Sequence, residues 1–149
     1  MTDVLFYHLE AHPLERVLPV LIERCVERGW RTVIQVGSEE RRDALDQLLW
    51  SFSDASFVPH GTSRDGPAAD QPVFLTVDGD NPNGASVRFL VDRAEPGDLT
   101  SYERAVLIFD GNDADALADA RRYWKEFKAA GLTLSYWQQD AGGRWQKKA

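Results

Sequence analysis

The sequence contains one cysteine, Cys25, so no disulfide can form within the chain. A lone cysteine in the apolar stripe of a predicted helix is typical of a packing residue in a reducing compartment. The sequence also lacks the run of about 18 apolar residues that a membrane-spanning helix needs, and its first residues lack a basic region followed by an apolar segment. We therefore expect a cytoplasmic protein with no membrane partner.

The chain has fewer basic than acidic residues. The chain has 17 Lys and Arg against 24 Asp and Glu, a net charge of -7, and such a surface repels nucleic acid. We therefore expect contact with nucleic acid only indirectly, through another protein. The charge is unevenly placed, because residues 1–113 carry ten basic against 20 acidic residues and residues 114–149 carry seven against four. The C-terminal end can thus attract an acidic partner.

Motifs for cofactors and catalysis are also missing. Neither glycine pattern that cradles phosphate follows the predicted strands, and the loop 10–14 has no glycine. The histidines His8, His12 and His60 have no companion cysteine or histidine cluster, so no metal site is predicted. A small enzyme that uses His8, His12 or His60 remains an alternative, although no nucleophile motif such as G-x-S-x-G supports it. We expect no catalytic site and no cofactor.

Apolar periodicity predicts alternating strands and helices. The resulting fold class is α/β: a three-layer, Rossmann-like arrangement with a mostly parallel sheet and helices on both faces. We expect a single domain over residues 1–139 and a polar, frayed tail over 140–149, despite Trp145. The expected strands span 4–9, 32–36, 73–77, 86–91, 105–109 and 132–137, and the expected helices follow Pro13, Ser38 and Asp113.

The helix predicted over 113–130 carries the informative pattern. Its core stripe is expected to contain Ala116, Ala120, Tyr123, Phe127 and Ala130. One border of that stripe is both apolar and cationic, and it contains Leu117, Arg121, Trp124, Lys125 and Lys128. One interpretation is a half-buried tryptophan beside solvated cations. The other is a shallow apolar site rimmed by cations, suited to an acidic peptide that ends in an aromatic residue and a free carboxylate.

Several segments, in order and over nearly the whole length, resemble the chi subunit family of bacterial DNA polymerase III. They are Val4–Leu9, Ala44–Trp50 followed by Ser56–His60, Asn81–Ala85, Phe109–Gly111, and Ala120–Lys125 with Phe127, Lys128 and Ala130–Gly131. The resemblance implies a non-catalytic accessory subunit with a Rossmann-like fold that uses no nucleotide. It also implies a role in DNA replication, linking the clamp loader to single-stranded-DNA-binding protein.

The resemblance further assigns two surfaces. Arg121 and Lys125 match the family's basic positions for the acidic, phenylalanine-ending tail of single-stranded-DNA-binding protein, and Trp124 takes the place of a family aromatic. Trp50 and Phe57, with Val58 and Pro59, match a surface for a psi-like clamp-loader subunit or a repair helicase. For this second surface, a loop packed back on the sheet by two aromatics is the alternative. A different adaptor of the same fold that binds another acidic peptide also remains open.

Overall fold

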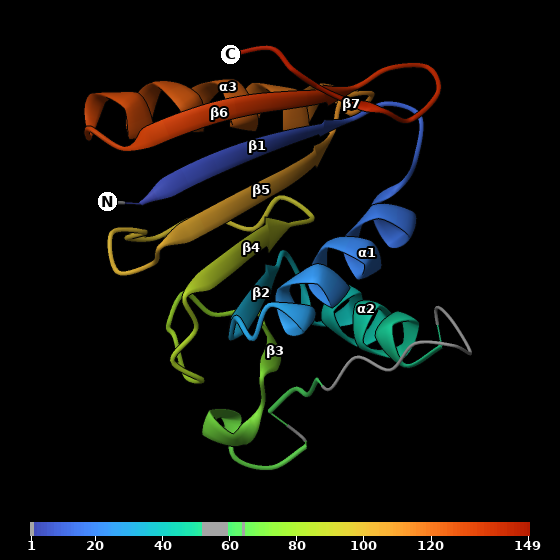
Figure 1. The fold of residues 1–149 in the computed structure, drawn as a ribbon, viewed down its shortest axis with the longest axis vertical. Coiled ribbons are helices and arrows are strands. Elements are labelled where there is room, and N and C mark those ends of the chain that lie inside the picture. Colours follow the sequence, from blue (N-terminus) through green and yellow to red (C-terminus); the bar gives the residue numbers. More distant parts are fainter. Residues whose placement is uncertain (1, 52–59, 64) are drawn as a thin grey trace.

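The computed structural model describes residues 2–51, 60–63 and 65–149. Seven strands form one sheet in the order β3-β2-β4-β5-β1-β6-β7, and every neighbouring pair is parallel except β6 with β7 (Figure 1). The elements are β1 (Asp3–Leu9), α1 (Leu14–Glu27), β2 (Thr32–Val36), α2 (Glu39–Ser51), the 3-10 turn η1 (Ala68–Asp70), β3 (Val73–Thr76), β4 (Val87–Val91), β5 (Arg104–Asp110), α3 (Ala114–Ala129), β6 (Thr133–Gln139) and β7 (Trp145–Lys147).

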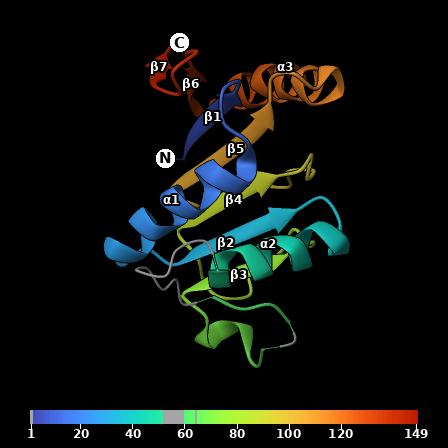
Figure 2. The same ribbon diagram turned by 90° about the vertical axis from the view of Figure 1, so that its right-hand side faces the viewer.

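The helices lie on both faces of the sheet, with α1 and α2 on one side and α3 on the other (Figures 1 and 2). The predicted α/β fold with a mostly parallel sheet is therefore confirmed. None of the helices in the described part of the chain is long and apolar enough to cross a membrane.

Strand β1 lies near the centre of this arrangement, between β5 and β6. Its side chains alternate between the two faces, as a pleated strand requires. Val4 and Phe6 are fully buried in the core under α3, whereas Leu9 is buried in the core under α1 and Tyr7 packs against that same core. The strand thus links two separate apolar cores, and α3 is positioned directly over one of them.

Local signals fix where the helices begin. The Ser38 hydroxyl accepts a hydrogen bond from the backbone N–H of Arg41, at 3.2 Å, as expected of a helix-capping serine. Asp113 caps α3, because its carboxylate accepts from the backbone N–H groups of Asp115 and Ala116 at 3.0 and 3.3 Å. Both helix starts agree with the prediction from sequence.

The C-terminal tail differs from the expected frayed end. Residues Trp145–Lys147 form β7, which pairs antiparallel with the edge of β6, and the backbone N–H of Lys148 donates to the Tyr136 carbonyl at 2.8 Å. The Trp145 ring stacks on Tyr7, with ring centroids 4.8 Å apart. This aromatic contact across the sheet is the physical reason for the order, since it buries apolar surface that a polar tail otherwise lacks.

Candidate functional site

Helix α3 rests on the sheet through the stripe that the sequence predicts. Ala116, Ala120, Tyr123 and Phe127 are all buried, and they pack against the core formed by β1, β5 and β6. Ala130 was expected on this stripe but is exposed, because the helix ends at Ala129 and Ala130 is its C-terminal cap. With this stripe packed on the sheet, the border of α3 next to β6 stays partly exposed to solvent.

The aromatic part of this border is Trp124. It is half-buried, and its ring meets Phe6 edge-on at 5.2 Å and Tyr136 edge-on at 5.9 Å between centroids. Leu117, about two helical turns before Trp124, packs partly against the same core. Trp124 is therefore held by two rings beneath it while part of its surface remains available to a ligand.

Three cations flank Trp124. Arg121, Lys125 and Lys128 are exposed, and within the described residues none of them has a carboxylate within 4.0 Å. Arg122 contrasts with them, since it pairs with Asp119 at 3.8 Å and Glu126 at 3.9 Å. The structure thus gathers all five predicted peptide-binding residues on one border and leaves its positive charge without an internal partner. We refer to Leu117, Arg121, Trp124, Lys125 and Lys128 as the α3 border.

A buried histidine supports this border from below. His8 Nδ1 lies 2.6 Å from the Tyr136 hydroxyl, and its Nε2 lies 3.2 Å from the Glu10 carboxylate. Burial lowers the pKa of His8, and the positive charge of Arg121 lowers it further, while the carboxylates of Glu10 and Asp110 oppose the shift. Burial raises the pKa of Tyr136, and Arg121 counteracts that rise. Arg121 therefore acts electrostatically on both members of the pair.

The three histidines lie in separate surroundings. His12 lies beside Gly143, where an added Cβ would overlap its ring. His60 is buried, with Nε2 3.2 Å from the Asp46 carboxylate and its ring 4.4 Å from that of Trp50. Among the described residues, no group of three or more His, Cys, Asp or Glu is arranged to hold a metal ion.

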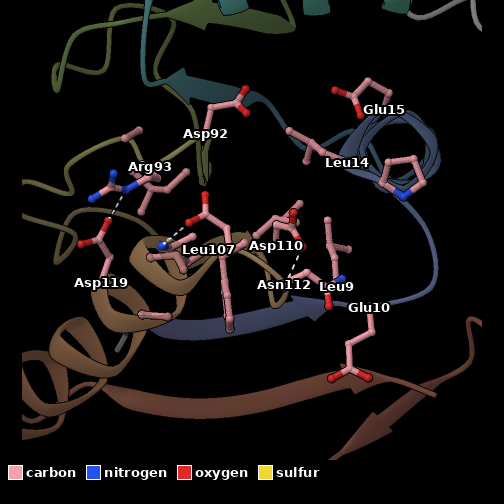
Figure 3. Close-up of a pocket in the computed structure, with 18 of the residues that line it drawn as sticks. Leu9, Glu10, Leu14, Glu15, Asp92, Arg93, Leu107, Asp110, Asn112 and Asp119 are labelled. Carbon is pink, nitrogen blue, oxygen red and sulfur yellow. Dashed lines mark hydrogen bonds and ion pairs between the residues drawn. The ribbon is translucent and has the colours of Figure 1, made fainter. Parts of the chain in front are cut away.

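A cleft of about 580 Å³ opens where β1, β4 and β5 end, the position at which open parallel sheets commonly bind ligands (Figure 3). Its walls are acidic. Arg41 pairs with Glu15 at 2.7 Å and Asp92 at 3.1 Å, and Arg93 pairs with Asp119 at 2.7 Å. The remaining acidic lining residues are Glu10, Asp110 and Asp113. This cleft therefore disfavours the phosphates that similar positions hold in other proteins.

The loop between β1 and α1 also has its backbone donors occupied. Gln139 Oε1, from β6, accepts from the N–H groups of Glu10, Ala11 and His12 at 3.1, 3.2 and 3.2 Å. Three successive N–H groups of this kind form a typical anion-binding concavity. In this chain an amide oxygen of the protein itself fills it, a contact that sequence reasoning missed because it joins residues about 130 positions apart.

The second predicted surface is only partly described. Trp50 is 48% exposed at the end of α2, which is unusual for a large aromatic residue. Phe57, Val58 and Pro59 lie outside the described residues. The structure thus locates one of the four residues on this surface, next to the buried His60.

Comparison with known proteins decides the family. The family described as "DNA polymerase III chi subunit, HolC" matches residues 1–135. The chain belongs to this family. The resemblance found in the sequence is therefore confirmed, and the protein is an accessory subunit of DNA polymerase III, with a role in DNA replication.

Three relatives illustrate the extent of the similarity within the family. The chain is 28% identical to the DNA polymerase III subunit chi of Pseudomonas aeruginosa, over 85% of this chain and 91% of that protein. It is 25% identical to the DNA polymerase III subunit chi of Escherichia coli, over 91% of this chain and 97% of that protein. The match to the probable chi subunit of Rickettsia prowazekii is 27% identical, over 73% of this chain and 66% of that protein, just under two thirds of its length.

Proposed function

We propose that this chi-family subunit links the clamp loader to single-stranded-DNA-binding protein by holding its acidic C-terminal tail on the α3 border. The observation that carries the proposal is a cluster of three cations around a half-buried tryptophan, with no carboxylate partner among the residues that the structure describes. Because residues 1–113 are strongly acidic, an acidic peptide is attracted to this border more than to the rest of the surface.

Recognition has two parts. The terminal aromatic side chain of the peptide packs against Trp124 and Leu117, and its carboxylates pair with Arg121, Lys125 and Lys128. Each charge-assisted hydrogen bond contributes about 1.5–3 kcal/mol and burial of one aromatic contributes about the same. Once the entropy lost on association is subtracted, we expect roughly micromolar affinity that weakens as salt is added.

A labelled peptide rich in aspartate and ending in Asp-Phe with a free carboxylate tests this site by fluorescence anisotropy. Lys125→Glu should weaken binding at least about tenfold, since it removes one charge-assisted contact and adds repulsion. Arg122→Glu is the matched control, because it makes the same charge change on the same helix at a residue that already has carboxylate partners. We expect it to change the affinity by less than about threefold.

Three outcomes would contradict the proposal. Equal effects of Lys125→Glu and Arg122→Glu would show that only the net charge of the protein matters. If a peptide with an amidated C-terminus binds as tightly as the peptide with a free carboxylate, the site does not recognise that carboxylate. A Kd that does not change between low and moderate salt would count against a charge-based site.

The clamp-loader connection is proposed to run through Trp50, Phe57, Val58 and Pro59, which contact a psi-like subunit or, in its place, a repair helicase. The exposure of Trp50 supports this role, since an exposed tryptophan is a frequent anchor of protein interfaces. Co-purification with a recombinant psi subunit should be reduced by Trp50→Ala and Phe57→Ala. Val20→Ser is the matched control, because Val20 is 47% exposed on α1. Equal recovery with all three variants would exclude this surface.

A further inference from the structure

A second group of cations without carboxylate partners lies on the opposite face of the sheet from α3. Arg24 and Arg28 at the end of α1 and Arg104 at the start of β5 line one pocket of about 240 Å³. Within the described residues, no carboxylate lies within 4.0 Å of any of the three. In a chain with net charge -7, three converging arginines without an internal anion are unexpected.

The tryptophan of this pocket holds two of the three guanidinium groups. The guanidinium carbon of Arg28 lies 5.0 Å from the centroid of the Trp30 ring, and that of Arg104 lies 5.1 Å from it. Each such cation–π contact attracts the guanidinium group to the ring and restricts the side chain. A stacked guanidinium keeps its N–H groups available at its edge, where they can donate in pairs to a carboxylate.

The positive charge of the three arginines converges inside the pocket. The charges of Arg104 and Arg24 both act to lower the pKa of the Tyr7 phenol, although burial raises it overall. Those of Arg104 and Arg28 act in the same way on the Cys25 thiol, whose pKa burial also raises. The partly buried Tyr7 of β1 and the buried Cys25 of α1 are therefore both affected by Arg104, and each is also affected by one of the two α1 arginines.

Helix electrostatics explain only part of this arrangement. The C-terminal end of a helix attracts positive charge, which accounts for Arg24 and Arg28 near the end of α1. It does not account for Arg104, which reaches the same tryptophan from β5. Bringing a third cation to this point costs repulsion that a bound anion would offset.

The walls of the pocket indicate what kind of anion fits. Besides the arginines and rings, it is lined by the apolar side chains of Leu5, Leu21, Val87, Phe89 and Val106. A bare phosphate would leave those walls without a partner, and a nucleic acid strand longer than the pocket would meet the acidic remainder of the surface. A ligand with a carboxylate next to an apolar side chain satisfies both the arginines and the walls.

We propose that this pocket is a second binding site for an acidic peptide segment of a partner protein, in which a carboxylate pairs with Arg24, Arg28 and Arg104 while a neighbouring apolar side chain enters the pocket. The site shares its ligand chemistry with the α3 border but does not depend on it, because the two lie on opposite faces of the sheet (Figure 2). One chain can then hold two acidic segments at once.

The experiment uses the full chain labelled with 5-fluorotryptophan, so that Trp30 and Trp124 report on the two sites by separate fluorine NMR signals, assigned from Trp→Phe variants. The probe is the Asp-rich peptide ending in Asp-Phe with a free carboxylate. We expect a saturable shift of the Trp30 signal that weakens with salt. Arg104→Glu should weaken binding at this signal at least about tenfold while leaving the response of Trp124 unchanged.

Controls make the result decisive. Arg16→Glu places the same charge change on the exposed first turn of α1, away from the pocket, and should leave the Trp30 response intact. Arg28→Gln repeats the test at an exposed residue in case Arg104→Glu disturbs folding. A Trp30 signal that does not move at 1 mM peptide, or that moves as much in both pocket variants as in the wild type, overturns the proposal. So does a response to single-stranded oligonucleotide without one to peptide.

The two proposals fail in different ways. Loss of the Trp124 response in Lys125→Glu with the Trp30 response retained supports both sites. A peptide response at Trp30 alone would overturn the α3 border and leave the arginine pocket standing, whereas a response at Trp124 alone would do the reverse.

Discussion

Gln139 offers a direct test of how the last parallel strand holds the first loop of the chain. Its side chain is 2% exposed and accepts three backbone hydrogen bonds from residues 10, 11 and 12. A net contribution of about 0.5–1.5 kcal/mol for each bond gives about 1.5–4.5 kcal/mol for the three together. Gln139→Met keeps the length and volume of the side chain but removes the acceptor, so we expect it to lower the free energy of unfolding by an amount in this range.

Urea denaturation followed by tryptophan fluorescence measures this loss, with unchanged m-values as evidence that the same surface unfolds. Gln139→Glu is the matched variant, because it retains an acceptor oxygen that three N–H groups can stabilise as a carboxylate. It should lose less than half as much stability as Gln139→Met. A change below about 0.5 kcal/mol for Gln139→Met, or equal losses for the two variants, would refute the reasoning.

Three further predictions concern the support of the α3 border and the tail. Because burial lowers the pKa of His8, the unfolded chain binds a proton more readily than the folded one. The free energy of unfolding should therefore be retained above about pH 6.5, the ordinary pKa of histidine, and should decrease as the pH falls from there to the lower pKa of His8 in the folded chain. Urea titrations at several pH values should show a smaller decrease for His8→Asn. Gly111→Ala should cost about 1–3 kcal/mol in the same assay, since its Cβ would overlap the His8 ring and push it from Tyr136; no loss would contradict that packing. Trp145→Ala should cost about 1–3 kcal/mol and speed amide hydrogen exchange in β7, and unchanged exchange would show that the stacking on Tyr7 does not hold the tail.

The sequence predicted the parts of the structure that depend on local periodicity. The buried stripe of α3, its Asp113 cap and its cationic border all follow from residues a few positions apart, and the structure has each of them. The same holds for the near-continuous apolar strands, which are typical of the interior of a parallel sheet. Local rules thus predict the apolar and cationic border of α3, whereas its assignment to a peptide rests on the family resemblance.

Contacts between distant segments were beyond that reasoning. The arginine pocket needs Arg104 beside Arg28, and only the strand order brings these residues together. The tail is another case, because its polar composition predicts fraying, whereas Trp145–Lys147 pair with β6 and Trp145 stacks on Tyr7. The contacts of Arg88 also depend on distant segments. Its strand is predicted from sequence, but its burial to 1% exposure is not. The buried guanidinium donates to Gln35, Tyr102 and backbone carbonyls.

The proposed adaptor role agrees with where the fold carries positive charge. In open parallel sheets a ligand commonly sits at the carboxyl ends of the strands, where backbone N–H groups and glycine-rich loops receive phosphate. Here that edge carries an acidic cleft, and its loop donors are bound to Gln139. An anion approaching this edge meets Glu10, Asp110 and Asp113, whereas one approaching the α3 border or the arginine pocket meets cations that pair with no carboxylate in the described part of the chain. The two proposed peptide sites agree with this distribution of charge, because electrostatic steering favours the approach of an acidic segment to the faces of the sheet over the usual ligand position.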